Sequence, residues 1–178
     1  MTPEEFRMTV LPEGRRLYAL TFRFLNSREE AEDAVQEVMM KLWSERNEKR
    51  DYSSVAAWCT TLTRNHCIDI LRKRKLLRLA DPAAAEEAAA GGADIIKMHE
   101  QREAAGLISL IISRMNEPVR SAAIMRDLEG YSYEETAEAM GTNIAALRTM
   151  ISRARKHIRE EMTRVYGYGT GEDKRSAR

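Results

Sequence analysis

The sequence has few aromatic residues and no long apolar run. Aromatic side chains make up only 6% of its 178 residues, whereas hydrophobic residues reach 43%. Small helical domains built on Leu, Ile, Val, Met and Ala have such a composition. No apolar stretch approaches the roughly 18 residues of a membrane-spanning helix, and the opening MTPEEFRMTV lacks the apolar core of a signal peptide. We therefore expect a cytoplasmic protein of one medium domain or two small ones.

Cysteine is nearly absent as well. Cys59 and Cys67 are the only two cysteines, and we expect them to be free thiols rather than a disulfide. With His66 they could form part of a zinc site, but no CxxC pair or second cluster of ligands completes it. They fit equally well as packing residues on one helix. We expect no metal and no cofactor.

The formal net charge of +1 conceals three stretches of one sign. Residues 29 to 37 contain five acidic residues and no basic one. Residues 64 to 78 are strongly basic, with only Asp69 against them, and residues 148 to 159 are basic without any acid. One acidic and two basic surfaces indicate two kinds of partner.

Helical periodicity organises residues 1–78 into a first domain. Apolar residues recur at helical spacing from Leu17 to Leu25, and Ser27 starts a second helix in which Glu30 would complete a capping box. Residues 45 to 54 are polar and predict a loop. Ser53 or Ser54 can cap a long third helix that runs to about residue 77.

The rest of the chain predicts a linker, a second domain and a tail. Residues 79–103 are rich in Ala and Gly and lack the large side chains of a core, which favours a flexible linker. Residues 104–166 form the second domain, in which Asn116 can cap a helix that ends at Gly130. Residues 167–178 are charged and Gly-rich, and we expect them to be disordered. The predicted fold class is all-α, with two small helical domains.

The second domain contains the pattern of a helix-turn-helix. Ser132 and Glu135 form a capping box for a short helix that stops at Gly141, and Asn143 caps a longer basic helix to about residue 162. The face of that helix which we expect to be exposed and to read DNA consists of Ala145, Arg148, Thr149, Ser152, Arg153 and Lys156. A basic solvated helix in an ordinary bundle is the structural alternative. The capping box, the turn glycine and the acid-free helix together favour DNA binding.

These segments resemble the bacterial RNA polymerase sigma factors of the extracytoplasmic-function (ECF) group, within the sigma-70 family. The most specific stretches are REEAEDAVQEVMMKLW, AAWCTTLTRNHCIDILRKRK and EGYSYEETAEAMGTNIAALRTMISRARK. In that family a helical domain called region 2 binds core RNA polymerase and the minus-ten promoter element. A linker joins it to region 4, whose helix-turn-helix reads the minus-thirty-five element.

The resemblance implies roles for residues of the first domain. Residues in the position that docks on the polymerase are Asp33, Gln36, Glu37 and Lys41. Asn65 falls where the family reads an extruded base of the non-template strand, and phosphates would be held by Arg64, Arg72, Lys73 and Arg74. Trp58 matches a family tryptophan that either stacks at the melted junction or fills the core, and we favour the core.

The recognition helix departs from the family pattern. The family has a small residue, a threonine and then a valine-lysine-serine run, whereas this chain reads AALRT from Ala145 onwards, followed by Met150. The upstream promoter sequence that it reads is therefore open.

The resemblance predicts a sigma factor that binds core RNA polymerase, recognises promoter DNA and promotes its melting. The alternative is a DNA-binding regulator that never replaces the specificity subunit of the polymerase. An enzyme is not expected, because the acidic stretch has no neighbouring histidine or lysine base and no GxxxxGK[ST] motif is present. Family members are commonly held inactive by an anti-sigma factor, which adds a candidate partner. We expect no small-molecule substrate and no insertion into a membrane, and a monomer when free.

Overall fold

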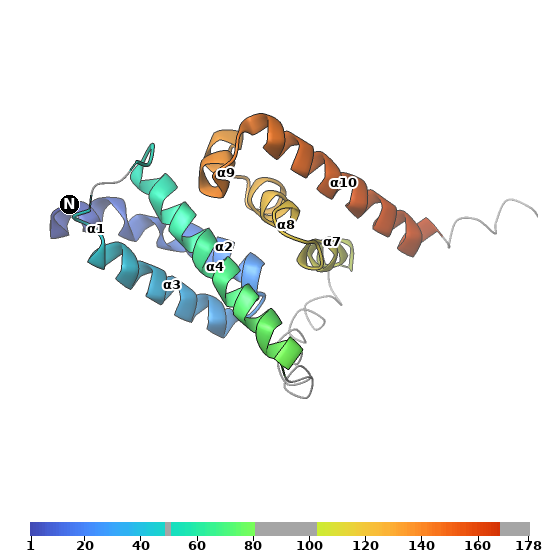
Figure 1. Cartoon of the computed structure of the whole chain (residues 1–178), viewed down its shortest axis with the longest axis horizontal. Helices are drawn as coiled ribbons and strands as arrows, with labels where there is room; N and C mark the ends of the chain where they lie inside the picture. The colour runs from blue at the N-terminus through green and yellow to red at the C-terminus, as the bar shows by residue number, and fades with distance from the viewer. Residues whose placement is uncertain (49–50, 81–102, 168–178) are drawn as a thin grey trace, which may run out of the picture.

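The computed structural model describes residues 1–48, 51–80 and 103–167, and all the regular structure in these ranges is helical (Figure 1). The predicted all-α class is therefore confirmed. The first domain contains α1 (Pro3–Thr9), the 3-10 turn η1 (Leu11–Glu13), α2 (Gly14–Leu25), α3 (Arg28–Ser44) and α4 (Val55–Ala80). The second contains α7 (Glu103–Ser113), α8 (Val119–Ala123), the π-helical turn η2 (Ile124–Leu128), α9 (Tyr133–Met140) and α10 (Ile144–Gly167). Most of the predicted linker and nearly all of the predicted tail lie outside the described residues.

Local capping sets the ends of the first-domain helices. Ser27 caps α3 by accepting a hydrogen bond from the Glu30 amide at 3.4 Å. The predicted capping box is only half formed, because the Glu30 carboxylate binds Arg74 on α4 instead of returning to the Ser27 amide. Ser54 caps α4 through a bond of 3.1 Å from the Ala57 amide. The short helix α1 was not predicted.

The helix-turn-helix signals are realised in the second domain. Ser132 and Glu135 form the reciprocal capping box at the start of α9, with bonds of 2.7 and 3.0 Å. Gly141 ends α9 with a φ of +60°, a left-handed conformation that glycine adopts without steric cost. Asn143 accepts a bond of 2.8 Å from the Ala146 amide and so begins α10. The predicted short helix is confirmed, and α10 runs five residues beyond the predicted end near residue 162.

The helix before this motif begins differently from the prediction. The backbone carbonyl of Asn116 accepts a bond from the Arg120 amide at 3.1 Å. The side chain that binds the first turn is that of Glu117, which accepts bonds from Arg120 Nε at 2.9 Å and from Ser121 Oγ at 2.5 Å. The Glu117 carboxylate is thereby fixed, partly buried, just before the start of α8.

The main apolar core is shared by the two domains. One cluster belongs to the first domain alone and surrounds Leu17, Val38 and Trp58. The largest cluster, in contrast, joins residues of α2 and α4, among them Leu20 and Phe24, to residues of α7, η2 and the turn before α9. In Figure 1, α2 and α4 both face the second domain, α3 lies behind them on the far side of the first domain, and α10 runs along the outer side of the second.

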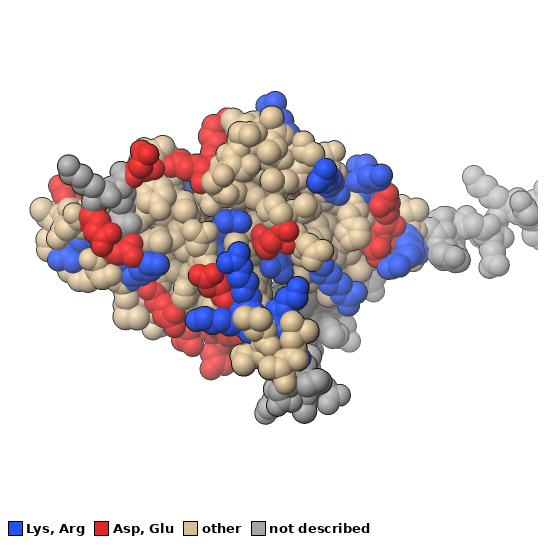
Figure 2. All heavy atoms as spheres, in the orientation of Figure 1, with Lys and Arg blue, Asp and Glu red and all other residues tan. Residues whose placement is uncertain are grey.

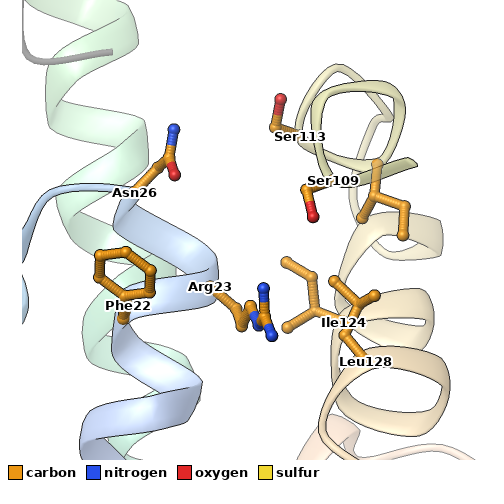
Figure 3. Close-up of a pocket in the computed structure, with 8 residues that line it drawn as sticks. Phe22, Arg23, Asn26, Ser109, Ser113, Ile124 and Leu128 are labelled. Atoms are coloured by element: carbon orange, nitrogen blue, oxygen red, sulfur yellow. The ribbon is translucent and has the colours of Figure 1, made fainter. Parts of the chain in front are cut away.

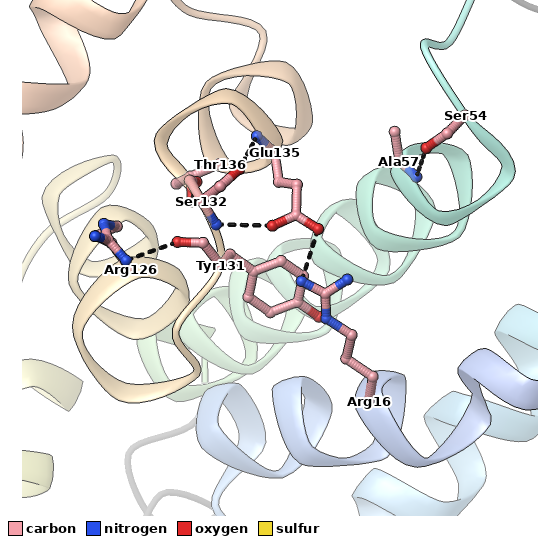
Figure 4. Close-up of polar contacts among 8 residues, drawn as sticks. All are labelled: Arg16, Ser54, Ala57, Arg126, Tyr131, Ser132, Glu135 and Thr136. Atoms are coloured by element: carbon pink, nitrogen blue, oxygen red, sulfur yellow. Dashed lines mark hydrogen bonds and ion pairs between the residues drawn. The ribbon is translucent and has the colours of Figure 1, made fainter.

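Polar contacts surround this shared core. Arg16 on α2 stacks on the ring of Tyr131 at 3.9 Å from its centroid and binds Glu135 on α9 at 2.8 Å (Figure 4). The ring of Tyr131 is fully buried, and its burial raises the pKa of the phenol to about 12. The ring of Tyr131 therefore fills apolar space between the two domains, and the guanidinium of Arg16 lies on one face of the ring.

A small cavity remains where α2 faces α7 and η2. Its volume is about 30 Å³, and it is lined by side chains that include Arg23, Asn26 and Ser109 (Figure 3). A volume of this size accommodates on the order of one or two water molecules. It is thus a gap in packing that is too small for a cofactor or substrate.

Candidate polymerase and nucleic-acid interfaces

The four residues predicted to dock on the polymerase lie on one exposed face of α3. Their spacing places Asp33, Gln36, Glu37 and Lys41 within the same sector of the helix, and all four side chains are exposed. The opposite face packs into the core through Ala31, Ala34, Val38 and Leu42. Acidic side chains gather over α3 along the lower left edge of Figure 2.

Large apolar side chains lie beside these charges. Met40 is 65% exposed and Trp43 is 40% exposed, and the Trp43 ring meets that of Phe6 edge-on, with centroids 5.0 Å apart. Glu37 lies 3.2 Å from Nε2 of His66 on α4, at one edge of this face. The face offers a partner both negative charge and exposed apolar area, the usual mixture at a protein interface.

Three of the predicted DNA contacts meet in one cleft. Arg64, Asn65 and Arg72 on α4 line an open cleft of about 470 Å³, together with Ile68, Asp69, Glu117 and Pro118. Asn65 and Arg72 are exposed there, and the Arg72 guanidinium lies 3.5 Å from the Asp69 carboxylate. Basic side chains gather over α4 in the centre of Figure 2, with a few carboxylates among them.

Arg64 is the least accessible of these contacts. Only 12% of its side chain is exposed, and its guanidinium lies 3.8 Å from the Glu117 carboxylate of the second domain. It also donates a hydrogen bond of 3.1 Å to the Asn65 side chain. Burial lowers the pKa of Arg64 and outweighs the opposing effect of Glu117. A partly desolvated arginine of this kind favours an anion as its partner.

The other first-domain residues named from the sequence lie elsewhere. Lys73 is exposed on α4. Arg74 binds the Glu30 carboxylate and, at 3.3 Å, the Leu25 carbonyl, so it joins the end of α2 to the start of α3. Trp58 is 3% exposed and belongs to the first-domain core, in keeping with the packing alternative. For Lys73 and Arg74 a contact with DNA stays a prediction.

The predicted reading face of α10 is exposed along its whole length. The exposed side chains on it are Ala145, Arg148, Thr149, Ser152, Arg153 and Lys156. Leu147, Ile151 and Ala154 on the opposite face are buried against the other helices of the domain. A helix that is held by one apolar stripe and presents a basic face outward can enter a major groove.

The structure adds supports for this face that the sequence did not single out. The guanidinium of Arg148 lies 5.4 Å from the centroid of the Tyr133 ring, and that of Arg126 lies 4.7 Å from it. Arg155 makes two bonds to Asp127, of 3.0 and 2.6 Å, and this carboxylate raises the pKa of the arginine. Asp127 and Arg155 are 28 residues apart, so no local spacing rule could have paired them.

The described residues include neither a helix able to span a membrane nor a cluster of metal ligands. No helix in the described ranges is long and apolar enough to cross a membrane. Among the same residues no group of three or more His, Cys, Asp or Glu side chains is placed to hold a metal ion. Cys59 and Cys67 are buried free thiols whose pKa values are raised to about 12 by burial.

Comparison with known families accounts for both domains. Residues 10–76 match the family described as Sigma-70 region 2, and residues 105–158 match Sigma-70, region 4. The two matches occur in the order that the sequence predicted. A regulator carrying only a helix-turn-helix would have no counterpart of the first match, so the sigma function is favoured over that alternative.

Individual relatives agree with this assignment. RNA polymerase sigma factor SigV of Bacillus subtilis is 28% identical, with 83% of this chain and 84% of SigV covered. ECF RNA polymerase sigma factor SigM of Mycobacterium tuberculosis is also 28% identical, with 86% and 73% covered.

Solved structures show the same fold. CnrH, determined in complex with the cytosolic domain of CnrY, aligns with a TM-score of 0.64 at 19% identity and covers 90% of this chain and 89% of its own. The sigma factor RpoE of Bartonella quintana, determined with the anti-sigma factor NepR, gives 0.63 at 21% identity, with 90% and 98% covered. The chain thus belongs to the ECF sigma factors of the sigma-70 family, non-enzymatic proteins that act with RNA polymerase to recognise promoters and initiate transcription.

Proposed function

We propose that the three surfaces described above divide the work of a sigma factor among them. The acidic face of α3 docks on core polymerase, the cleft beside α4 captures single-stranded promoter DNA, and the exposed face of α10 reads the upstream duplex. The observation that carries this proposal is that every predicted contact on α3 and α10 is exposed, while the opposite faces of both helices are buried. We place this activity in the cytoplasm, where polymerase and promoter DNA meet.

The α3 face suits a basic partner. Asp33 and Glu37 project from neighbouring turns beside the exposed Met40. Carboxylates that face arginines or lysines speed association and fix the orientation of the complex. The adjacent apolar area supplies the burial that exposed ion pairs lack.

The cleft beside α4 suits an extruded base and its phosphates. Asn65 has an amide donor and an acceptor for a base edge, and Arg64 and Arg72 supply positive charge on either side of it along α4. Strand capture at this site would stabilise the melted promoter. Melting is then driven by binding energy, as the resemblance implies for a protein without a nucleotide-hydrolysis motif.

The face of α10 suits a major groove. Arg148 can make a bidentate contact with guanine, which discriminates against the wrong base by about 1–3 kcal/mol. Thr149 and Ser152 lie on the same face and are short enough to reach bases or phosphates.

We also propose that an anti-sigma factor regulates this protein. The support is the likeness to RpoE of Bartonella quintana, whose structure was determined with the anti-sigma factor NepR. Such a partner would have to cover at least one of the three surfaces in order to block initiation.

Run-off transcription with purified core polymerase on a promoter library tests the proposal. New start sites that depend on this protein are expected. Asp33→Arg should abolish them by preventing docking, and Asn65→Ala should reduce open-complex formation, read by permanganate footprinting, while polymerase binding is retained.

Glu32→Arg is the matched control for docking. Glu32 is exposed on α3 but lies outside the sector that holds Asp33 and Glu37, and its contact is with Arg28 on the same helix at 3.8 Å. The same change of charge should leave polymerase binding nearly intact. If no start site depends on the protein, or if Glu32→Arg is as harmful as Asp33→Arg, the assignment of these surfaces is wrong.

A further inference from the structure

The contact between the two domains has a consistent polarity. Among the residues that the structure describes, three ion pairs cross it, and in each the arginine belongs to the first domain and the carboxylate to the second: Arg16 with Glu135 at 2.8 Å, Arg23 with Glu129 at 2.8 Å, and Arg64 with Glu117 at 3.8 Å. A fourth contact is a hydrogen bond of 2.7 Å from the Ser53 amide to the Glu138 carboxylate. The second domain therefore presents an acidic side to the first.

One of these carboxylates lies in the proposed strand-capture cleft. Glu117 lines the same cleft as Arg64, Asn65 and Arg72. Its carboxylate lies 3.8 Å from the guanidinium of Arg64, the group that a DNA phosphate in this cleft would have to bind. A carboxylate presents its two oxygens to a guanidinium much as a phosphate does. Glu117 is held in this place by its own bonds to Arg120 and Ser121.

The other two surfaces are unaffected by this arrangement. The predicted docking residues on α3 and the reading face of α10 are exposed while the domains are packed together. Of the three surfaces, the cleft beside α4 is the one that residues of both domains line. The packed arrangement thus leaves polymerase and duplex DNA access to their surfaces and limits access to the cleft.

We propose that this packed arrangement is a closed state in which the second domain competes with single-stranded DNA for the cleft beside α4, with Glu117 occupying the place of a DNA phosphate. The proposal rests on the proposed function, since it assigns strand capture to Arg64 and Asn65. Strand capture then requires Glu117 to withdraw from Arg64. Docking on polymerase and contact with the upstream duplex can precede that step.

Two measurements on the full chain test the closed state. The first is the binding of a fluorescein-labelled single-stranded oligothymidylate, read by anisotropy at low salt, which reports phosphate contacts without requiring a promoter sequence. The second is energy transfer between dyes on Arg28→Cys and Glu160→Cys, both at exposed positions of different domains. The native Cys59 and Cys67 are buried and should label slowly under native conditions.

Charge reversal at the interface gives the sharpest variants. Arg23→Glu and Glu129→Arg each place like charges together, so both should lower the energy transfer and tighten oligothymidylate binding by about three- to fivefold, the size of one exposed ion pair. Arg23→Glu is the more informative change, because it removes positive charge and would weaken DNA binding if no opening occurred. The double variant restores the pair with reversed sign, and it should return both readings towards those of the unchanged protein.

Glu117 itself is tested by Glu117→Gln. The expected result is tighter oligothymidylate binding, whereas Glu134→Gln, the same change at an exposed position of α9, should have a much smaller effect. Oligothymidylate should also lower the energy transfer of the otherwise unchanged protein.

The closed state is excluded if Arg23→Glu and Glu129→Arg leave the energy transfer unchanged. Competition is excluded if they open the protein without tightening DNA binding, or if the double variant restores neither reading. These assays contain no polymerase, so a failure here is distinguishable from a failure of run-off transcription, which would overturn the proposed function itself.

Discussion

The two long basic helices of this sigma factor differ in how their charges are used. α4 and α10 contain 26 and 24 residues and have similar charge. α10 lies on the outer side of the second domain and is held by one apolar stripe, which leaves its reading face exposed. α4 lies between two neighbours, and its arginines are partly occupied: Arg74 binds Glu30 of its own domain, and Arg64 meets Glu117 of the other.

The difference shows that a basic stretch in a sequence does not by itself define an available DNA surface. The number of helix faces that are packed decides how many charges remain free. On α10 the apolar and basic residues separate cleanly by helical spacing. On α4 apolar residues face two directions, since Trp58 packs within the first domain and Ile68 packs in the shared core.

Substitution of Trp58 should have the largest effect and sharpens the contrast between the helices. The ring is 3% exposed in the first-domain core, so Trp58→Ala should lower the free energy of unfolding by about 3–5 kcal/mol. Thermal and denaturant unfolding of the purified protein measure this loss. Trp58→Phe should recover much of it because it keeps an aromatic ring in the core.

Trp43→Ala is the matched control on α3, where the ring is 40% exposed. Its cost should be smaller, about 1–2 kcal/mol, since less apolar area is lost from the folded protein. Equal losses for the two tryptophans would contradict the core role of Trp58 and favour the alternative in which its ring stacks at the melted junction.

Arg148 and Arg155 test whether position on α10 decides function. Arg148→Ala removes a side chain of the exposed reading face and should weaken use of a selected promoter by about 1–3 kcal/mol, or roughly 5- to 150-fold. Arg155→Ala removes a side chain that already makes two bonds to Asp127, so its effect on promoter use should be smaller.

Competition binding between the selected upstream element and its single-base variants measures both changes. Arg148→Ala should relax the preference at one base position. Arg155→Ala should leave the pattern of preferences unchanged. If Arg155→Ala relaxes the base preference and Arg148→Ala does not, the side of α10 that contacts bases is centred nearer to Arg155 than to Arg148.

Local signals in the sequence were enough to predict the helix-turn-helix. The cap at Asn143, the box at Ser132 and the turn at Gly141 all depend on residues within four positions of one another. Their outcome is therefore set by short stretches of sequence. The exposed face of α10 followed from the same reasoning, because only one stripe of that helix is apolar.

The contacts between the domains could not be predicted in this way. Arg16 and Glu135 are separated by 119 positions, and no periodicity links them. The capping box predicted at Ser27 is incomplete for a related reason. The Glu30 carboxylate on α3 binds Arg74 on α4, which is 44 positions away in the sequence. Glu117 likewise gave no signal in the sequence beyond being an acid before a proline.

Gly141 tests the turn that separates the two helices of the reading motif. A Cβ at this position would meet no atom within 4 Å, but the φ of +60° is unfavourable for any residue with a side chain. Gly141→Ala should therefore destabilise the protein by about 1 kcal/mol through the backbone alone, measured as a shift in Tm. Gly14→Ala is the control: its φ of −50° is ordinary helix and the new Cβ would lie 3.4 Å from Met39 Cε, so it should stabilise the protein slightly, by up to about 1 kcal/mol. If Gly141→Ala lowers the free energy of unfolding by much more than about 1 kcal/mol, the added Cβ meets neighbouring atoms and the turn is more tightly packed than the structure shows.

The smallest expected effect concerns pH and the link between the domains. Burial tends to raise the pKa of Glu135. The hydrogen bonds from Ser132 and Arg16 lower the pKa by more than burial raises it, so the net shift is downward from 4.5. Because the pKa is depressed in the folded protein, the charge stabilises at pH values above about 4.5, and this stabilisation is lost as the pH falls through the folded-state pKa. Glu135→Gln keeps an acceptor for the capping box while removing the charge.

The unchanged protein should therefore exceed Glu135→Gln in Tm at pH 7, and the difference should shrink at pH values below about 4.5. Since 37% of the Glu135 side chain is exposed, solvent screening limits this difference to less than about 1 kcal/mol. Glu134→Gln, at the exposed neighbouring position, should show a smaller difference at pH 7. A gap between the protein and Glu135→Gln that stays constant from pH 7 to pH 3.5 would show that Glu135 acts as a cap alone. In that case the pair with Arg16 would contribute nothing to holding the second domain against the first.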